Sequence, residues 1–170
     1  MDNVDLWLAE IAKHRDSGVA IDTQLLLLLW IGGFDRTQIG RKRLGQYNET
    51  DFDLLVGLVS HCSKLVTTPN VLTEVSNLAG QLPGELAEEF REEFCLVVEK
   101  LDERYHESVA VTKLAGFLRL GLADGTLLNL ARQGVLVLTD DFPLYQQLAN
   151  ENLPALNFTH FRTAAYGWQT

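Results

Sequence analysis

The 170-residue sequence has only two cysteines and four prolines, and it contains no long apolar run. Its longest unbroken apolar stretch, Leu25 to Ile31, is far shorter than the roughly 20 residues that a bilayer-spanning helix needs, so we expect no membrane span and no membrane partner. The N-terminal segment is acidic before it becomes basic, unlike a secretory signal, which favours a cytoplasmic protein. We therefore expect Cys62 and Cys95, each in an apolar helical stretch, to be reduced core thiols.

Basic residues are also scarce, because 14 lysines and arginines stand against 23 aspartates and glutamates, for a net charge of −9 at pH 7. This balance argues against a broad electrostatic attraction to nucleic acid. The composition is 46% hydrophobic and 22% charged, which is typical of a globular protein. The length fits a single domain over residues 1–170.

Strand and helix patterns alternate along the chain. Continuous apolar segments predict strands at 19–21, 65–67 and 135–139, and an edge strand at 153–158. Apolar residues at helical spacing predict helices at 4–15, 23–31, 50–62, 69–78, 85–105, 124–131 and 143–150. Because this alternation requires right-handed crossovers, we expect an α/β fold, with a doubly wound, mainly parallel central sheet flanked by helices and an N-terminal helical extension.

Two of these helices carry further signals. A capping box between Thr50 and Asp53 is expected to open the helix at 50–62. The helix at 85–105 carries eight acidic residues around its apolar stripe, and we interpret them as a solvated face. Residues 32–48 show no consistent apolar period, which predicts a loop or a partly helical excursion.

Acidic residues directly follow two of the predicted strands. Asp22 follows the first strand, and Asp140 and Asp141 follow the strand at 135–139. Sites in doubly wound sheets lie outside the carboxyl ends of the strands, so these side chains are expected at one edge of the sheet. Clustered carboxylates there require a cation or a change of protonation. The alternative for each aspartate alone is a helix N-cap.

Four segments, in this order and over nearly the entire chain, together resemble the PIN domain nucleases: VAIDTQLLLLLW, TTPNVLTEVSNL, LGLADGTLLNLARQGVLVLTDDFPLYQQLA and NFTHFR. The resemblance implies that the catalytic, metal-binding acids are Asp22, Glu74, Asp124 and Asp141. It also implies that Thr139 orients Asp141 at the substrate site. Asp140 is the alternative to Asp141 as the fourth metal ligand.

The chemistry of these residues accounts for their types. Carboxylates without histidine suit Mg²⁺ or Mn²⁺, which prefer hard oxygen ligands and keep exchangeable waters. A bound ion would activate water and neutralise charge on the leaving oxygen, so no protein nucleophile is needed. The resemblance implies a metal-dependent endoribonuclease that hydrolyses RNA phosphodiester bonds and leaves 5′-phosphate and 3′-hydroxyl ends.

One basic cluster is a candidate for contact with RNA. Arg36, Arg41, Lys42 and Arg43 are expected at the rim of the acidic site, where they would contact phosphates. The alternative is a solvated loop whose arginines pair with the acidic helix. Weaker candidates for the same role are Arg119, Arg132 and Arg162, and a structural role is favoured for His160 over a catalytic one.

Other functions compete with this hypothesis. An aspartyl-nucleophile phosphatase needs a second aspartate two residues after the first, where this chain has Gln24, and a receiver domain carries its acidic pair after the first strand and not after a late one. The serious alternative is a catalytically weak PIN-fold module that binds RNA or protein. If the nuclease is the toxin of a toxin–antitoxin pair, its partners include a cognate protein antitoxin or inhibitor as well as RNA. A homodimer is a further alternative that the sequence leaves open.

Overall fold

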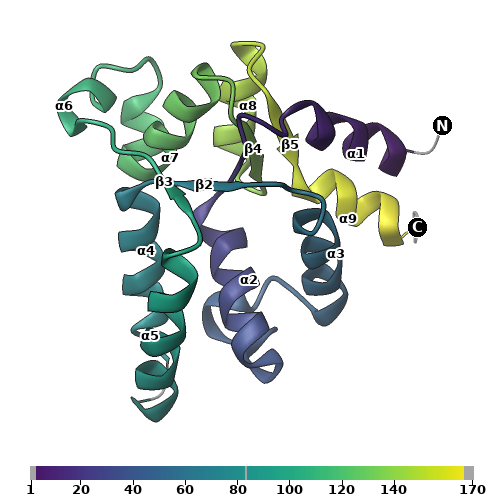
Figure 1. Cartoon of the computed structure of the whole chain (residues 1–170), viewed down its shortest axis with the longest axis vertical. Coiled ribbons are helices and arrows are strands. Elements are labelled where there is room, and N and C mark those ends of the chain that lie inside the picture. Colours follow the sequence, from purple (N-terminus) through teal and green to yellow (C-terminus); the bar gives the residue numbers. More distant parts are fainter. Residues whose placement is uncertain (1–2, 83, 167–170) are drawn as a thin grey trace.

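The structure, a computed structural model, describes residues 3–82 and 84–166. In these residues five strands form one parallel sheet in the order β3-β2-β1-β4-β5 (Figure 1). The strands are β1 (Val19–Ile21), β2 (Leu65–Thr67), β3 (Asp102–Glu103), β4 (Leu136–Thr139) and β5 (Ala155–Asn157). The fold is therefore the α/β class expected from the sequence, with an all-parallel sheet flanked by helices.

The central strands explain why continuous apolar segments predicted them well. Every residue of β1 and β4 is buried, because helices cover both faces of a parallel sheet. The two strands pair in register, with Val19 opposite Leu136 and Ile21 opposite Leu138. Their carboxyl ends consequently lie side by side at one edge of the sheet.

Helices and short 3₁₀ turns make up most of the rest of the described chain. The α-helices are α1 (Asn3–Lys13), α2 (Thr23–Phe34), α3 (Glu49–Val59), α4 (Pro69–Ala79), α5 (Gly84–Val98), α6 (Ser108–Val111), α7 (Phe117–Arg132), α8 (Phe142–Asn150) and α9 (Phe158–Tyr166). The 3₁₀ turns η1 (Arg36–Gln38) and η2 (Lys42–Leu44) occupy the segment predicted as a partly helical loop. None of the helices in residues 3–82 and 84–166 is both long and apolar enough to cross a membrane.

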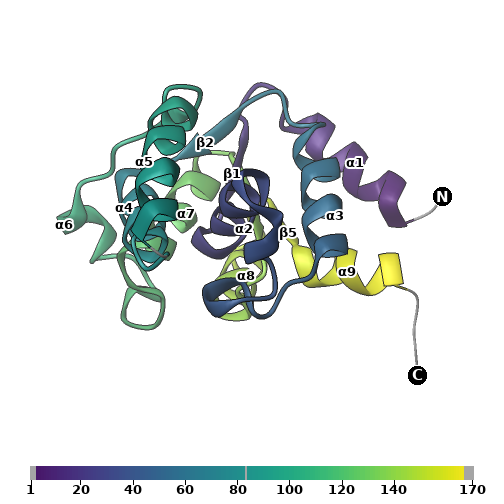
Figure 2. The same ribbon diagram turned by 90° about the horizontal axis from the view of Figure 1, so that it is seen from below.

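The leucine-rich helix α2 is the centre of the core. It packs against α3, α4 and α5, so it is surrounded by protein rather than half-exposed (Figure 2). Leu25, Leu27 and Leu28 are fully buried, as expected for a helix that is apolar on all sides. Helices α1 and α9 lie side by side in both views, where the rings of Trp7 and Phe161 are 4.0 Å apart (Figures 1 and 2). The expected N-terminal helical extension is therefore present and docked.

Helix α3 begins one residue before the predicted start. Its N-cap is Asn48, whose side chain accepts a hydrogen bond from the Asp51 backbone, while the Asp51 side chain accepts one from the Asn48 backbone in return. The prediction of a capping box between Thr50 and Asp53 is therefore wrong, and the Asp53 carboxylate instead accepts a hydrogen bond from Arg36.

The predicted helix at 85–105 is also wrong in its last third. Helix α5 ends at Val98, and the chain then forms β3, which pairs with β2 through Val66 opposite Asp102 and Thr67 opposite Glu103. Backbone hydrogen bonding to a sheet edge thus overrides the helical spacing of the apolar side chains. Two further helices, α6 and α9, were not predicted, and helix α7 starts at Phe117, earlier than expected.

The cysteines are free thiols, but they are not both core residues. Cys62 lies beyond the end of α3 and is half-buried, and burial raises the pKa of its thiol to about 11. Cys95 is exposed on α5, because the apolar stripe of that helix faces the core through other positions. The prediction of two core thiols was therefore wrong for Cys95.

A buried ion pair fastens α9 to α3. The Asp51 side chain is fully buried, and its oxygens accept hydrogen bonds from Arg162 Nε at 2.7 Å and Arg162 Nη2 at 3.0 Å. The Tyr166 hydroxyl donates to the same carboxylate at 2.6 Å. Arg162, a weaker candidate for RNA contact, is therefore paired with a carboxylate of the protein itself.

Replacing Arg162 with alanine should lower the free energy of unfolding by about 3 kcal/mol, because it leaves the buried charge of Asp51 without its cation. Urea unfolding measures this loss. The matched control is Arg132→Ala, which breaks the more exposed pair with Glu151 and should cost less than about 1 kcal/mol. Equal losses in the two variants would contradict the importance assigned to the buried pair.

Candidate metal centre

Asp22 lies where β1 ends and α2 begins. Its Oδ1 accepts a hydrogen bond from the Leu25 backbone at 2.8 Å, which makes it the N-cap of α2. Its Oδ2 accepts from the Thr139 hydroxyl and, at 2.9 Å, from the Asp140 backbone. The side chain is buried, so a single carboxylate joins the carboxyl ends of β1 and β4.

Thr139 ends β4 and has both of its hydroxyl contacts within the protein. Its oxygen donates to Asp22 and accepts from the Asp141 backbone at 2.9 Å. The Asp141 carboxylate caps α8 by accepting from the Leu144 backbone at 2.7 Å. Thr139 is fully buried, and its hydroxyl holds the Asp22 carboxylate and the Asp141 backbone in place. Its predicted contribution to a substrate site stays a prediction.

Glu74 comes from helix α4, which starts directly after β2 with Thr68 as its N-cap. Its Oε2 accepts a hydrogen bond from the Thr23 hydroxyl at 2.8 Å. Thr23 is the residue after Asp22, so this bond brings Glu74 to the same edge of the sheet. Glu74 is exposed, so its carboxylate lies outside the core.

Asp124 lies in α7, three residues after a break in that helix. Gly121 has φ 78° and ψ −168°, a conformation that is essentially restricted to glycine, so the helix restarts there. The pKa of Asp124 is raised to about 7, first by burial and then by the negative charges of Asp141, Asp22 and Glu74. The other three predicted acids thus lie close enough to act electrostatically on Asp124.

Asp140 belongs to the same group of acids. Its carboxylate accepts hydrogen bonds from the hydroxyl of Tyr47 and, at 3.4 Å, from the amide of Gln46. Burial raises the pKa of Asp140, and burial followed by the charge of Asp140 raises the pKa of Asp22 to about 7. The pKa of Tyr47 is also raised, by burial and by the same carboxylate. Sequence reasoning missed Tyr47 and Gln46, because nothing in a loop sequence indicates which distant carboxylate it will contact.

The donor set suits a hard divalent cation, because it consists of carboxylate oxygens without histidine or cysteine. The arrangement of these carboxylates is less complete than a metal site requires. Among the described residues, no group of three or more acidic, histidine or cysteine side chains is arranged to hold a metal ion. Both oxygens of Asp22 point to protein donors, and one oxygen each of Glu74 and Asp141 does the same.

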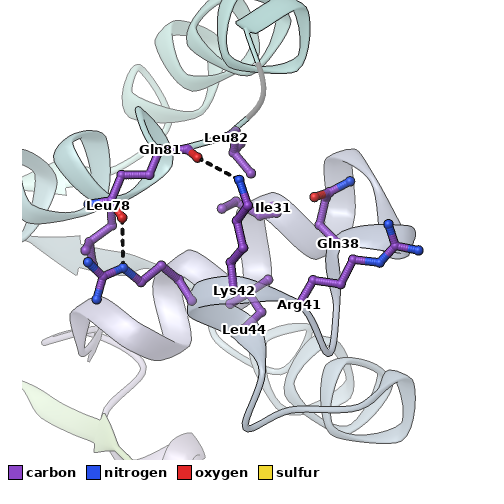
Figure 3. A pocket seen from close by; sticks show the side chains of 9 residues that line it. Ile31, Gln38, Arg41, Lys42, Leu44, Leu78, Gln81 and Leu82 are labelled. Atoms are coloured by element: carbon purple, nitrogen blue, oxygen red, sulfur yellow. Dashed lines mark hydrogen bonds between the residues drawn. The ribbon is translucent and has the colours of Figure 1, made fainter.

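The structure divides the predicted basic cluster into two parts. Arg36 pairs with Asp53 at 2.7 Å and lies over the ring of Phe52, so its partner is α3 and not the acidic helix α5. In contrast, Lys42 Nζ donates to the Gln81 carbonyl at 3.3 Å and Arg43 Nε donates to the Gln81 side chain at 3.0 Å (Figure 3).

A small pocket lies between the C-terminal halves of α2 and α4, and it is lined by Arg41, Lys42 and Arg43 (Figure 3). Its floor is apolar and consists of Ile31, Leu44, Leu78 and Leu82. Glu74 lies in α4, and Gln81, which accepts hydrogen bonds from Lys42 and Arg43, follows seven positions later, just after the end of that helix. Leu78, which lines the pocket, is four residues after Glu74 in α4, so at about 1.5 Å per residue it lies about 6 Å along the helix from Glu74.

The remaining predicted residues take structural roles or lie beside α8. Arg132 forms a bidentate pair with Glu151 across α7 and α8. Arg119 donates to the Pro143 carbonyl at 3.0 Å, and the exposed ring of His160 meets the ring of Tyr145 edge-on at 5.6 Å.

The metal-free protein should lose stability as the pH rises through the titration of Asp22 and Asp124. The folded pKa values, about 7, lie above the ordinary value of about 3.9, so between these pH values the folded chain holds protons that the unfolded chain has released. The free energy of unfolding therefore falls across this window. Asp22→Asn should make the fall shallower, as measured by urea unfolding in EDTA.

The control for this experiment is Asp16→Asn, which removes an exposed carboxylate outside the cluster. Its pH profile should match that of the wild-type protein. A wild-type slope that Asp22→Asn leaves unchanged would show that the carboxylates are not electrostatically strained in the fold.

Comparison of the sequence with models of known protein families gives no match, and comparison with curated proteins gives none either. The assignment of this site therefore depends on the chain's own residues and their geometry.

Proposed function

We propose that this chain is a metal-dependent endoribonuclease of the PIN type. The observation that carries the proposal is geometric: the paired ends of β1 and β4 bring Asp22, Asp140 and Asp141 to one edge of the sheet, and Thr23 holds Glu74 at the same edge. Burial and then the charges of Asp141, Asp22 and Glu74 accordingly raise the pKa of Asp124. Four acids that come from distant parts of the sequence and repel one another are a costly arrangement for a fold alone. A divalent cation would convert that cost into binding energy.

The residues that would hold the ion are Asp22, Glu74, Asp124 and Asp141, with Asp140 beside them. When bound, Mg²⁺ or Mn²⁺ would lower the pKa of a water molecule and neutralise charge on the phosphate. Hydrolysis would then join the water oxygen to phosphorus and break the bond to the 3′ oxygen. Because the bond between phosphorus and the 3′ oxygen breaks, the products carry a 5′-phosphate and a 3′-hydroxyl.

The protein's own groups prepare this site by fixing its acids in place. Thr139 and the Asp140 backbone hold one oxygen of Asp22, and Thr23 holds one oxygen of Glu74. Glu74 is exposed and Asp124 is half-buried, and Thr23 holds only one of the two carboxylate oxygens of Glu74. The proposal requires the side chains of Glu74 and Asp124 to rotate toward an ion, because the described acids do not form a ready-made ligand set.

The incomplete ligand set favours one competing function. A PIN-like module that binds RNA or protein without turnover needs the fold but no assembled ligand set, and the present arrangement of the described acids suits it as well. Metal binding and cleavage separate the two.

Mn²⁺ should stabilise the wild-type protein and leave Asp22→Asn nearly unchanged. An ion at about 100 times its dissociation constant adds roughly 2.7 kcal/mol, or about 7 °C in melting temperature for a chain of this size. Melting curves in EDTA and in Mn²⁺ measure the difference. Wild-type protein should also cleave a mixed RNA pool with Mn²⁺, and Asp22→Asn should not.

Asp16→Asn is the matched control and should respond to Mn²⁺ like the wild type. An equal rise in melting temperature for wild type and Asp22→Asn would refute Asp22 as a ligand. Stable, folded wild-type protein that binds RNA without a Mn²⁺ response or cleavage would leave the binding module as the function.

The basic pocket should contribute affinity without sequence preference. Neutral replacement of Arg41, Lys42 and Arg43 by glutamine should weaken RNA binding roughly uniformly, because these side chains would bind phosphates and not bases. The salt dependence should fall by about one unit of slope for each phosphate that the variant no longer neutralises. Filter binding across a salt series measures this. Cleavage at saturating RNA should survive, and unchanged affinity at low salt would show that these cations do not touch RNA.

A further inference from the structure

An exposed aromatic residue lies at the first position of helix α8. Phe142 directly follows Asp141, the N-cap carboxylate of the acidic group, and its side chain is 64% exposed. A single exposed apolar side chain is ordinary on a protein surface, whereas a larger apolar patch marks an interaction site. The fold does not require the ring there, because the apolar contacts of α8 with the core are made by the buried Leu144 and Leu148.

Phe142 is part of a larger strip along one side of α8. Tyr145 is three residues further on, so both rings lie on the same side of the helix. Tyr145 contacts the ring of His160 from α9 at 5.6 Å between centroids. The strip of Phe142, Tyr145 and His160 therefore extends aromatic surface from the acidic group across two helices.

An exposed cation borders this strip. The Arg119 guanidinium, from α7, donates to the Pro143 carbonyl at 3.0 Å and to the side chain of Gln146 at 3.3 Å. Gln146 is four residues from Phe142 and thus on the same side of α8. No carboxylate neutralises Arg119 within the described part of the chain.

We propose that this strip is a binding site for unpaired nucleobases, with Phe142 as the stacking platform and Arg119 as the contact to the adjacent backbone. Aromatic rings interleaved with cations are the combination by which proteins hold single strands, because every base offers a π face and every linkage a charge. The inference rests on the proposed function in taking RNA as the ligand.

The experiment measures binding in EDTA, where metal-dependent cleavage is absent. The probe is a fluorescein-labelled oligouridine of about ten nucleotides, compared by anisotropy with a blunt RNA duplex of the same length. Wild type should bind the single strand more tightly. Phe142→Leu keeps an apolar side chain but loses the ring, and it should weaken single-strand binding about tenfold while leaving duplex binding unchanged.

The variant Phe142→Trp tests the same idea from the other direction, because it keeps an aromatic ring at this position. It should retain affinity for oligouridine, and its added tryptophan emission, taken as a difference from wild type, should be quenched by the RNA. Leu96→Ala, which trims an exposed apolar residue on α5, is the matched control and should bind like wild type. Arg119→Gln should lower the salt slope by about one unit.

The inference is overturned if Phe142→Leu binds oligouridine like wild type, if both RNAs lose affinity equally, or if the added emission is insensitive to RNA. A changed oligomeric state in Phe142→Leu with unchanged RNA affinity would make the strip a protein contact instead. The nuclease proposal is separately tested. If Phe142→Leu weakens single-strand binding but the wild type never cleaves RNA with Mn²⁺, the stacking site is supported and the nuclease proposal is refuted. If the wild type cleaves RNA but Phe142→Leu binds like wild type, the nuclease is supported and the stacking site is refuted.

Discussion

The buried carboxylate of Asp22 is the contact on which the geometry of this protein depends. Its side chain caps α2 and accepts hydrogen bonds from the Thr139 hydroxyl and the Asp140 backbone. These bonds fix the positions of the ends of β1 and β4 and the start of α2 relative to one another. These three donors offset part of the cost of burying this carboxylate. The same bonds aim the chain after β4, and therefore Asp140 and Asp141, at the edge where Asp22 lies.

The stability of the metal-free fold and the proposed binding of a cation would make opposite demands on this edge. Burial and mutual repulsion raise the pKa of Asp22 and of Asp124 to about 7, so near neutral pH the metal-free fold either holds extra protons or tolerates unscreened charge. Meanwhile the core under the site is dense, with fully buried leucines along α2. A well-packed core of this kind can support a locally unfavourable cluster, which is the usual relation between scaffold and site.

The sequence indicated much of this arrangement and missed the rest for identifiable reasons. Strands β1 and β4 were predictable because strands buried on both faces are continuously apolar, and Asp22 and Asp141 follow from their position at strand ends. Strand β3 was missed because its two residues, Asp102 and Glu103, are acidic and join the sheet through backbone bonds alone. The contacts of Tyr47 with Asp140 and of Gln81 with Lys42 span 93 and 39 residues, and local patterns carry no information on such pairings.

The break in α7 at Gly121 has a consequence for the sign of the field at this edge. Because the helix restarts there, Asp124 lies near a helix beginning, as Asp22 and Asp141 do at the N-caps of α2 and α8. Each helix beginning carries a partial positive charge of roughly half a unit from its macrodipole. Three such ends converge beneath the acids, so backbone dipoles offset part of the negative charge. If these aspartates were replaced by neutral residues, the three helix beginnings would leave the edge less negative and would favour the approach of anions such as phosphate.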